Sequence, residues 1–159
     1  MRDAESILSL LDRLGAIEIG SWPVRAMGKP RMTQRDRWNP SPQVKRYLAF
    51  KDELRLRTAS RRSHIEEVLF SPGSTTAWIF YVKMPTSYYR GGKRSSENTK
   101  AFKLRNTGMD QKPDLDNIMK AVWDTLAIED KAIYGLMAWK LWSDEDRITM
   151  YHVPHSLHG

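Results

Sequence analysis

The sequence feature that most constrains the fold is the run TTAWIFYVKM at residues 75–84. Its β-branched and aromatic residues are typical of a β-strand, and Pro85 ends the run because proline cannot donate to a strand ladder. Apolar residues do not alternate with polar ones here, as they would in a strand with one face in solvent. We therefore expect residues 75–84 to form a central strand that is buried on both faces.

The flanking sequence predicts helices and further strands around this strand. Apolar residues recur at helical spacing in residues 3–14, 43–58 and 116–127, and strand-like runs occupy residues 16–22, 132–142 and 147–153. Only residues 143–146 separate the last two runs, which predicts a hairpin. These elements indicate an α+β fold in which helices pack against a small mixed β-sheet. We expect one domain over residues 1–159, with a helical N-terminal extension at 1–15 and a flexible tail at 154–159.

Composition excludes several classes of protein. The chain has no cysteine, which excludes disulfides and thiolate metal sites. No apolar run approaches the roughly 20 residues that cross a bilayer. The N-terminus carries early acids and lacks the apolar core of a secretory signal. These features predict a cytoplasmic protein with no membrane partner, and the net charge of +7 favours a polyanionic partner.

Charge is segregated along the chain. Residues 25–62 contain 12 lysines and arginines against 3 acids, residues 83–112 contain 8 against 2, and residues 113–159 contain 4 against 8. A surface adapted only for solubility intersperses the two signs. The pattern therefore favours a phosphate-binding face beside a cation-binding centre.

The two basic blocks supply the candidate DNA-binding residues. The first contains a basic arm at residues 25–38 that ends in a tryptophan suited to stacking on bases. The second is a polar loop at residues 86–112, and a loop of this length in a compact domain is usually functional or disordered. We predict DNA contacts from Lys29, Arg31, Arg35, Arg37, Trp38, Lys93, Arg94, Lys103 and Arg105. The alternative is that the arm and the loop are solvated segments without a ligand.

The acidic block opens with the motif KPDLDNIMK at residues 112–120. Side chains two residues apart share a face of an extended strand, so Asp114 and Asp116 could converge on one divalent cation. Metal ions held by carboxylates can activate water and stabilise the charge that develops at a phosphodiester. Lys120 follows Asp116 by one helical turn, where it can orient that carboxylate or contact the phosphate. The two aspartates alone are weak support for a metal site, because Asp116 also suits a helix N-cap.

The motif and its continuation resemble a known family. The order DLDNIMKA at residues 114–121, DTL at 124–126 and ED at 129–130 is similar to the signature of the RusA-type Holliday junction resolvases of bacteria and phages. The segment GKPRM at residues 28–32, with Trp38 and Tyr47, resembles the N-terminal part of phage members. The similarity spans roughly residues 17–152 and leaves out the N-terminal helix.

The resemblance implies a homodimeric, magnesium-dependent endonuclease that nicks four-way DNA junctions symmetrically, with Mn²⁺ as a substitute metal. It implies Asp114, Asp116 and Asp130 as metal ligands and catalytic acids, Lys120 as the catalytic lysine, and Glu129 as an auxiliary acid. The cytoplasm would be that of a bacterial cell or a phage-infected host. The insertion at residues 86–112 and the N-terminal helix depart from the enterobacterial pattern, which leaves the choice among branched DNA substrates open.

Two other functions remain open from the sequence. A non-catalytic DNA-binding accessory protein of replication or recombination would use the same acids only as caps and in ion pairs. A metal-dependent nucleotidyl transferase would use similar metal chemistry on a different substrate. A cleavage assay on branched DNA separates the first of these from a nuclease.

Two lesser motifs have simpler interpretations. Asp144 and Asp146 form a second pair of aspartates, but they lie in a predicted turn, where aspartate accepts backbone hydrogen bonds. His152, His155 and His158 have loose metal-like spacing near the C-terminus, where we expect an irregular terminus or adventitious metal binding and no catalytic site.

Overall fold

The computed structural model describes residues 2–71, 75–90, 99–129, 131 and 133–154, and it confirms the central strand. Strand β2 (Thr75–Lys83) lies inside a four-stranded mixed sheet of order β1-β4-β2-β3. Its side chains alternate between two cores: Trp78 and Phe80 face one, and Ala77 and Ile79 face the other. All four are almost fully buried, so β2 is covered on both faces as its uninterrupted apolar run predicts.

The predicted hairpin is wrong. Strands β3 (Gly135–Ser143) and β4 (Arg147–Val153) both pair with β2, on opposite sides: β3 runs parallel to it and β4 antiparallel. The turn between them crosses the end of β2, where Lys83 donates its N–H to Asp146 Oδ1 at 2.9 Å and Met84 donates to the Ser143 carbonyl at 3.0 Å. A third strand can therefore lie between two strands that are joined by a short turn. Here β2 does so, and it forms hydrogen bonds with β3 along one edge and with β4 along the other.

Strand β1 (Ile17–Trp22) completes the sheet at the far edge. It pairs antiparallel with β4, from Ile17 opposite His152 to Trp22 opposite Ile148, with a register shift between Glu18 and Gly20. The first strand, β1, and the last strand, β4, are thus neighbours in the sheet.

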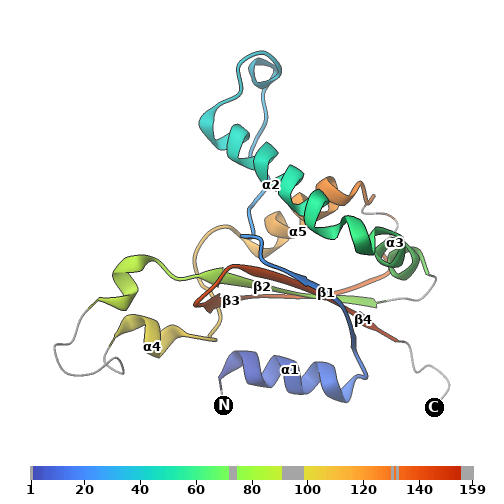
Figure 1. The fold of residues 1–159 in the computed structure, drawn as a ribbon, viewed down its shortest axis with the longest axis vertical. Helices are drawn as coiled ribbons and strands as arrows, with labels where there is room; N and C mark the ends of the chain where they lie inside the picture. The colour runs from blue at the N-terminus through green and yellow to red at the C-terminus, as the bar shows by residue number, and fades with distance from the viewer. Residues whose placement is uncertain (1, 72–74, 91–98, 130, 132, 155–159) are drawn as a thin grey trace.

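The helices cover the sheet unequally (Figure 1). Helices α2 (Pro42–Thr58), α3 (Arg62–Phe70) and α5 (Leu115–Leu126) lie on one face, and α1 (Asp3–Arg13) covers the other. The N-terminal helix is a packing element: its buried residues Ala4, Ile7 and Leu11 join Ile79 in the smaller core. No described helix has the length and apolar character needed to cross a bilayer. This arrangement confirms an α+β fold with helices against a mixed sheet.

Helix α3 is missing from the helices predicted at residues 3–14, 43–58 and 116–127. The structure has the short 3-10 helix η2 (Ala59–Arg61) followed directly by α3. Ile65, Val68 and Leu69 recur at helical spacing and are buried in the main core. The apolar pattern is short and follows Arg61 and Arg62 closely, so the sequence alone did not indicate a helix here.

The described parts of the predicted loop at residues 86–112 are structured. They contain the 3-10 helix η3 (Thr86–Tyr89) and helix α4 (Lys100–Leu104). Residues 106–109 then follow the outer edge of β3, with backbone bonds from Asn106 to the Trp142 carbonyl at 2.8 Å and from Met109 to the Lys140 carbonyl at 3.0 Å. An ordered segment therefore covers half of a strand edge that would otherwise be unpaired.

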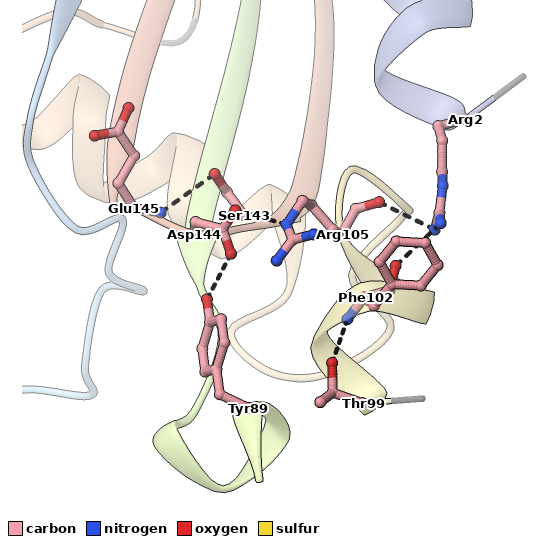
Figure 2. Close-up of polar contacts among 8 residues, drawn as sticks. All are labelled: Arg2, Tyr89, Thr99, Phe102, Arg105, Ser143, Asp144 and Glu145. Atoms are coloured by element: carbon pink, nitrogen blue, oxygen red, sulfur yellow. Dashed lines mark hydrogen bonds and ion pairs between the residues drawn. The ribbon is translucent and has the colours of Figure 1, made fainter. Parts of the chain in front are cut away.

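The turn after β3 anchors this region, as Figure 2 shows. Asp144 accepts hydrogen bonds from Arg105 at 2.6 Å and from Tyr89 at 2.8 Å. Arg2, next to α1, donates to the carbonyl of Phe102 at 3.0 Å and lies over that ring. Asp144 and Asp146 lie in the turn, as predicted, and both have structural partners: Asp146 accepts from a backbone N–H, whereas Asp144 accepts from two side chains. Of the predicted tail at 154–159, only Pro154 belongs to the described residues.

Candidate functional site

The aspartate motif lies where an extended segment enters helix α5. Asp114 occupies the N-cap position in an extended conformation, so the prediction that Asp116 caps the helix is wrong. Asp116 instead belongs to the first turn, and its carboxylate lies 3.7 Å from the Lys120 ammonium one turn later. Both acids lie at the positive end of the helix dipole, which favours negative charge there. The Asp114 side chain makes no capping hydrogen bond and remains available to another ligand.

Two residues that sequence reasoning missed hold this entry segment in place. Lys140, on β3, donates from its ammonium to the carbonyls of Gln111 at 2.6 Å and Pro113 at 2.9 Å. The Asn117 side-chain amide donates to the Lys29 carbonyl at 3.2 Å, and the Lys29 N–H donates to the Asn117 backbone carbonyl at 3.4 Å. The strand and the basic arm therefore fix the start of α5 from two sides.

Gly28 allows the arm to approach the helix this closely. A Cβ at that position would lie 2.6 Å from the Asn117 amide nitrogen and 3.0 Å from the Pro113 Cβ. Any larger residue would push the arm away from the segment that carries Asp114. The glycine of the GKPRM segment is thus explained by the close approach of its backbone to the side chains of Asn117 and Pro113.

The arm, helix α2 and the start of α5 enclose a groove of about 760 Å³. Its bases come from the arm, from α2 and from the residues ahead of Asp114: Arg25, Lys29, Arg31, Arg46 and Lys112. Two acids line it, Glu53 and Asp114. The volume falls in the range of about 300–1,000 Å³ typical of sites for small ligands, which is enough for a short stretch of one DNA strand. The groove thus joins part of the basic arm to one of the two motif aspartates.

Asp116 and Lys120 do not face this groove. They line a separate hollow of about 340 Å³ between α5 and β3, together with apolar residues that include Met119 and Leu136. The first turn of α5 therefore separates the two hollows, with Asp114 on one side and Asp116 on the other. The extended geometry assumed for the two aspartates is wrong, because one lies before the helix and one inside it.

The predicted DNA-binding residues are distributed over several places. Lys29 and Arg31 line the groove, whereas Arg35 and Arg37 lie on the exposed 3-10 helix η1 (Gln34–Arg37), ahead of α2. Trp38 follows η1 and is 88% exposed, as a stacking residue must be. In Figure 1 this segment projects beyond the N-terminal end of α2.

The bases of the second block lie elsewhere. Lys103 is exposed on α4, and Arg105 forms the 2.6 Å ion pair with Asp144 that Figure 2 shows. Burial alone would raise the pKa of Asp144, but hydrogen bonds from Arg105 and Tyr89 outweigh it and lower the pKa. Arg105 therefore has a structural partner already. Lys93 and Arg94 lie outside the described residues.

A polar cluster around Asp124 links the arm, α2 and α5. Its carboxylate accepts a 2.6 Å hydrogen bond from the Tyr47 hydroxyl and lies 3.0 Å from Lys51 and 3.6 Å from Lys29. Burial alone would raise the pKa of Asp124, but hydrogen bonds from Tyr47 and Lys51 and the charges of both lysines outweigh it and lower the pKa. Burial, with the bond to Asp124, raises the pKa of Tyr47 well above its usual value. At neutral pH a neutral phenol thus donates to an ionised carboxylate.

The carboxylates that could hold a metal are described only in part. Asp114 and Asp116 are both exposed, and oxygen donors of this kind suit Mg²⁺. Asp130, the third predicted ligand, lies outside the described residues, and Glu129 pairs with Lys131 at 3.0 Å. Across the part of the chain that the structure describes, no group of three potential ligands gathers. His152 lies in β4, whereas His155 and His158, like Asp130, lie outside the described residues.

Comparison with known proteins identifies the family. A family model described as endodeoxyribonuclease RusA matches residues 22–151, which include the arm, the groove and the start of α5 and leave out α1. No curated protein and no solved structure matched the chain. Because the family match covers most of the chain and all of the groove, the chain belongs to the RusA endodeoxyribonuclease family.

Proposed function

We propose that the protein is a metal-dependent, structure-specific endodeoxyribonuclease that resolves Holliday junctions or related branched DNA by paired symmetric nicks. The observation that carries this proposal is the placement of Asp114, which lines the same groove as five basic residues in a chain of the RusA family. The basic residues attract the phosphates of a DNA strand. Carboxylate oxygens beside them can hold the cation that hydrolysis of a phosphodiester needs.

The metal ligands in this proposal are Asp114 and Asp116, with Asp130 as the third. Mg²⁺, or Mn²⁺ in its place, would be held by Asp114, whose side chain makes no capping hydrogen bond, and by Asp116 in the first turn of α5, near the positive end of the helix dipole. When bound, the metal activates water and neutralises charge on the phosphate. The Lys120 ammonium is exposed beside Asp116, and in this proposal it contacts the phosphate and stabilises negative charge during cleavage.

Paired nicks on opposite strands call for two active sites related by two-fold symmetry, and we propose that a homodimer supplies them. A four-way junction has such symmetry itself, so each copy would meet an equivalent strand. Light scattering at micromolar concentration should give about twice the chain mass, and a monomer under all conditions would contradict this part of the proposal.

The function is tested with labelled four-way junction and linear duplex of the same sequence. We expect nicks in the junction with Mg²⁺ and none with EDTA, and little cleavage of the duplex. A protein that binds the junction but leaves it intact under every metal and salt condition would be the accessory DNA-binding protein instead.

The groove itself makes a separate prediction. Arg46 on α2 lines it, whereas its neighbour Lys45 does not. Replacing one phosphate-contacting base lowers the salt dependence of binding by about one unit of slope and weakens binding about equally for all sequences. We therefore expect Arg46→Met to have this effect in junction-binding titrations at several salt concentrations. Lys45→Met is the matched control, and equal effects of both substitutions would mean that the groove does not hold DNA.

A further inference from the structure

Asp124 lies in the last turn of α5, away from both motif aspartates, and no step of the proposed cleavage uses it. Its carboxylate nonetheless has three partners from two other segments: Tyr47 and Lys51 from α2, and Lys29 from the arm. The backbone of Lys29 is hydrogen-bonded to Asn117 in the first turn of the same helix. The Lys29 side chain therefore runs along α5 from Asn117 to Asp124.

The acceptor is held more firmly than a surface carboxylate would be. Tyr47 is fully buried, and its hydroxyl donates to Asp124 Oδ2 at 2.6 Å. Lys51, only 16% exposed, binds the same oxygen and lies over the Tyr47 ring, 5.6 Å from its centroid. Oδ1 is left to face Lys29 at 3.6 Å. A buried phenol and a half-buried lysine thus fix the position of the oxygen that Lys29 meets.

Lys29 faces two ways. Its side chain is 42% exposed, and the same residue lines the groove together with Asp114. An exposed ion pair contributes little to stability, so the pair with Asp124 has no evident purpose in holding the fold together. It does restrict the rotamers of a long flexible side chain before any ligand arrives, which lowers the cost of ordering that side chain on binding.

We propose that Asp124 is a positioning residue for DNA cleavage: fixed by Tyr47 and Lys51, it orients the Lys29 ammonium so that this lysine meets a backbone phosphate of the strand in the groove in one geometry. This inference rests on the proposed nuclease function and names the residue that aligns its substrate. Because the Asp124 carboxylate also partly neutralises the charge of the Lys29 ammonium, it lowers the affinity for DNA while it aligns the lysine.

A double-mutant cycle tests the proposal, with Asp124→Asn, Lys29→Met and the double variant. An asparagine oxygen can still accept from Tyr47, so the cluster keeps its shape. We expect Asp124→Asn to slow single-turnover cleavage at saturating junction about tenfold, without weakening binding, and to have less than about a twofold effect on the rate in the Lys29→Met protein. Asp52→Asn removes the same charge from an exposed site on α2 and should change neither quantity.

Several outcomes would overturn the proposal. One is an equal loss of rate from Asp124→Asn with and without Lys29, which would mean that Asp124 does not act through the lysine. Another is weaker binding with an unchanged rate. If Asp124→Asn does not fold, Lys29→Arg gives the same test from an exposed position: it keeps the charge but changes the geometry, so a native rate would contradict a positioning role.

Failure of the nuclease function is distinguishable from failure of this inference. If the native protein cuts no branched DNA with any metal, the proposed function is wrong. The coupling between Asp124 and Lys29 is then measured from the affinity for the junction alone. Asp124→Asn should tighten junction binding by about two- to fivefold when Lys29 is present and by less than about twofold in the Lys29→Met protein. Equal effects in both backgrounds would reject the coupling.

Discussion

Asp116→Asn should lower the rate of junction cleavage by at least about 1,000-fold, equal to about 4 kcal/mol of activation free energy, while junction binding stays the same or tightens. The substitution removes a proposed metal ligand, and it also removes one negative charge from the start of α5, which lowers the repulsion of DNA phosphates. The side chain is 74% exposed and contacts only Lys120 among its described partners, so the fold should be unaffected. Single-turnover cleavage with Mg²⁺ and binding with Ca²⁺ measure the two quantities separately.

Asp110→Asn is the matched control for this experiment. Asp110 is an exposed aspartate in the segment that leads to Asp114, and it lines neither of the two hollows beside α5. Its substitution should leave the cleavage rate within about twofold of native, because a solvent-exposed charge outside the site is screened. Cleavage at the native rate by the Asp116 variant would show that the metal is held elsewhere.

Phe80→Ala should lower the free energy of unfolding by about 3–5 kcal/mol, a large part of the about 5–15 kcal/mol that holds a typical domain together. Phe80 is completely buried at the centre of β2 and stacks on Trp78, with ring centroids 6.4 Å apart. Its loss leaves a cavity between the sheet and the helices that form the groove. Urea denaturation followed by circular dichroism measures the change.

Leu56→Ala is the comparison for the core substitution. Leu56 lies on α2 and is 77% exposed, so its truncation should change stability by no more than about 0.5 kcal/mol. If the two variants were equally stable, Phe80 would not be part of a packed core, and the position of β2 inside the sheet would be wrong.

The sequence predicts local structure well where buried apolar residues form an uninterrupted run or recur at a regular spacing. The uninterrupted apolar run of β2 indicates a strand covered on both faces, and the spacing of Ile118, Met119 and Val122 predicts α5. It fails for α3, whose apolar pattern is short. It also fails for the pairing of β3 with β4, because a short turn shows only that two strands run in opposite directions. Which strand fills the space between them depends on residues 60 or more positions away.

The candidate site was predictable in its residue types and less so in its geometry. Asp114, Asp116 and Lys29 follow from motif and charge. The placement of the two aspartates on different sides of a helix start depends on where α5 begins, and element boundaries are the least certain feature of a sequence. Lys140 and Asp124 have no local signal, since their partners Pro113 and Tyr47 come from distant segments.

The strand order has a consequence for how the chain is made. β4 lies between β1 and β2, so neither of those strands has its full set of neighbours until residues 147–153 have left the ribosome. β2 likewise waits for β3, which begins 60 residues later. Such distant pairings slow folding, and early strands stay unpaired while synthesis continues. The four-stranded sheet should therefore be complete only after residues 147–153 have been synthesised, because β4 is the last of its four strands and joins β1 to β2.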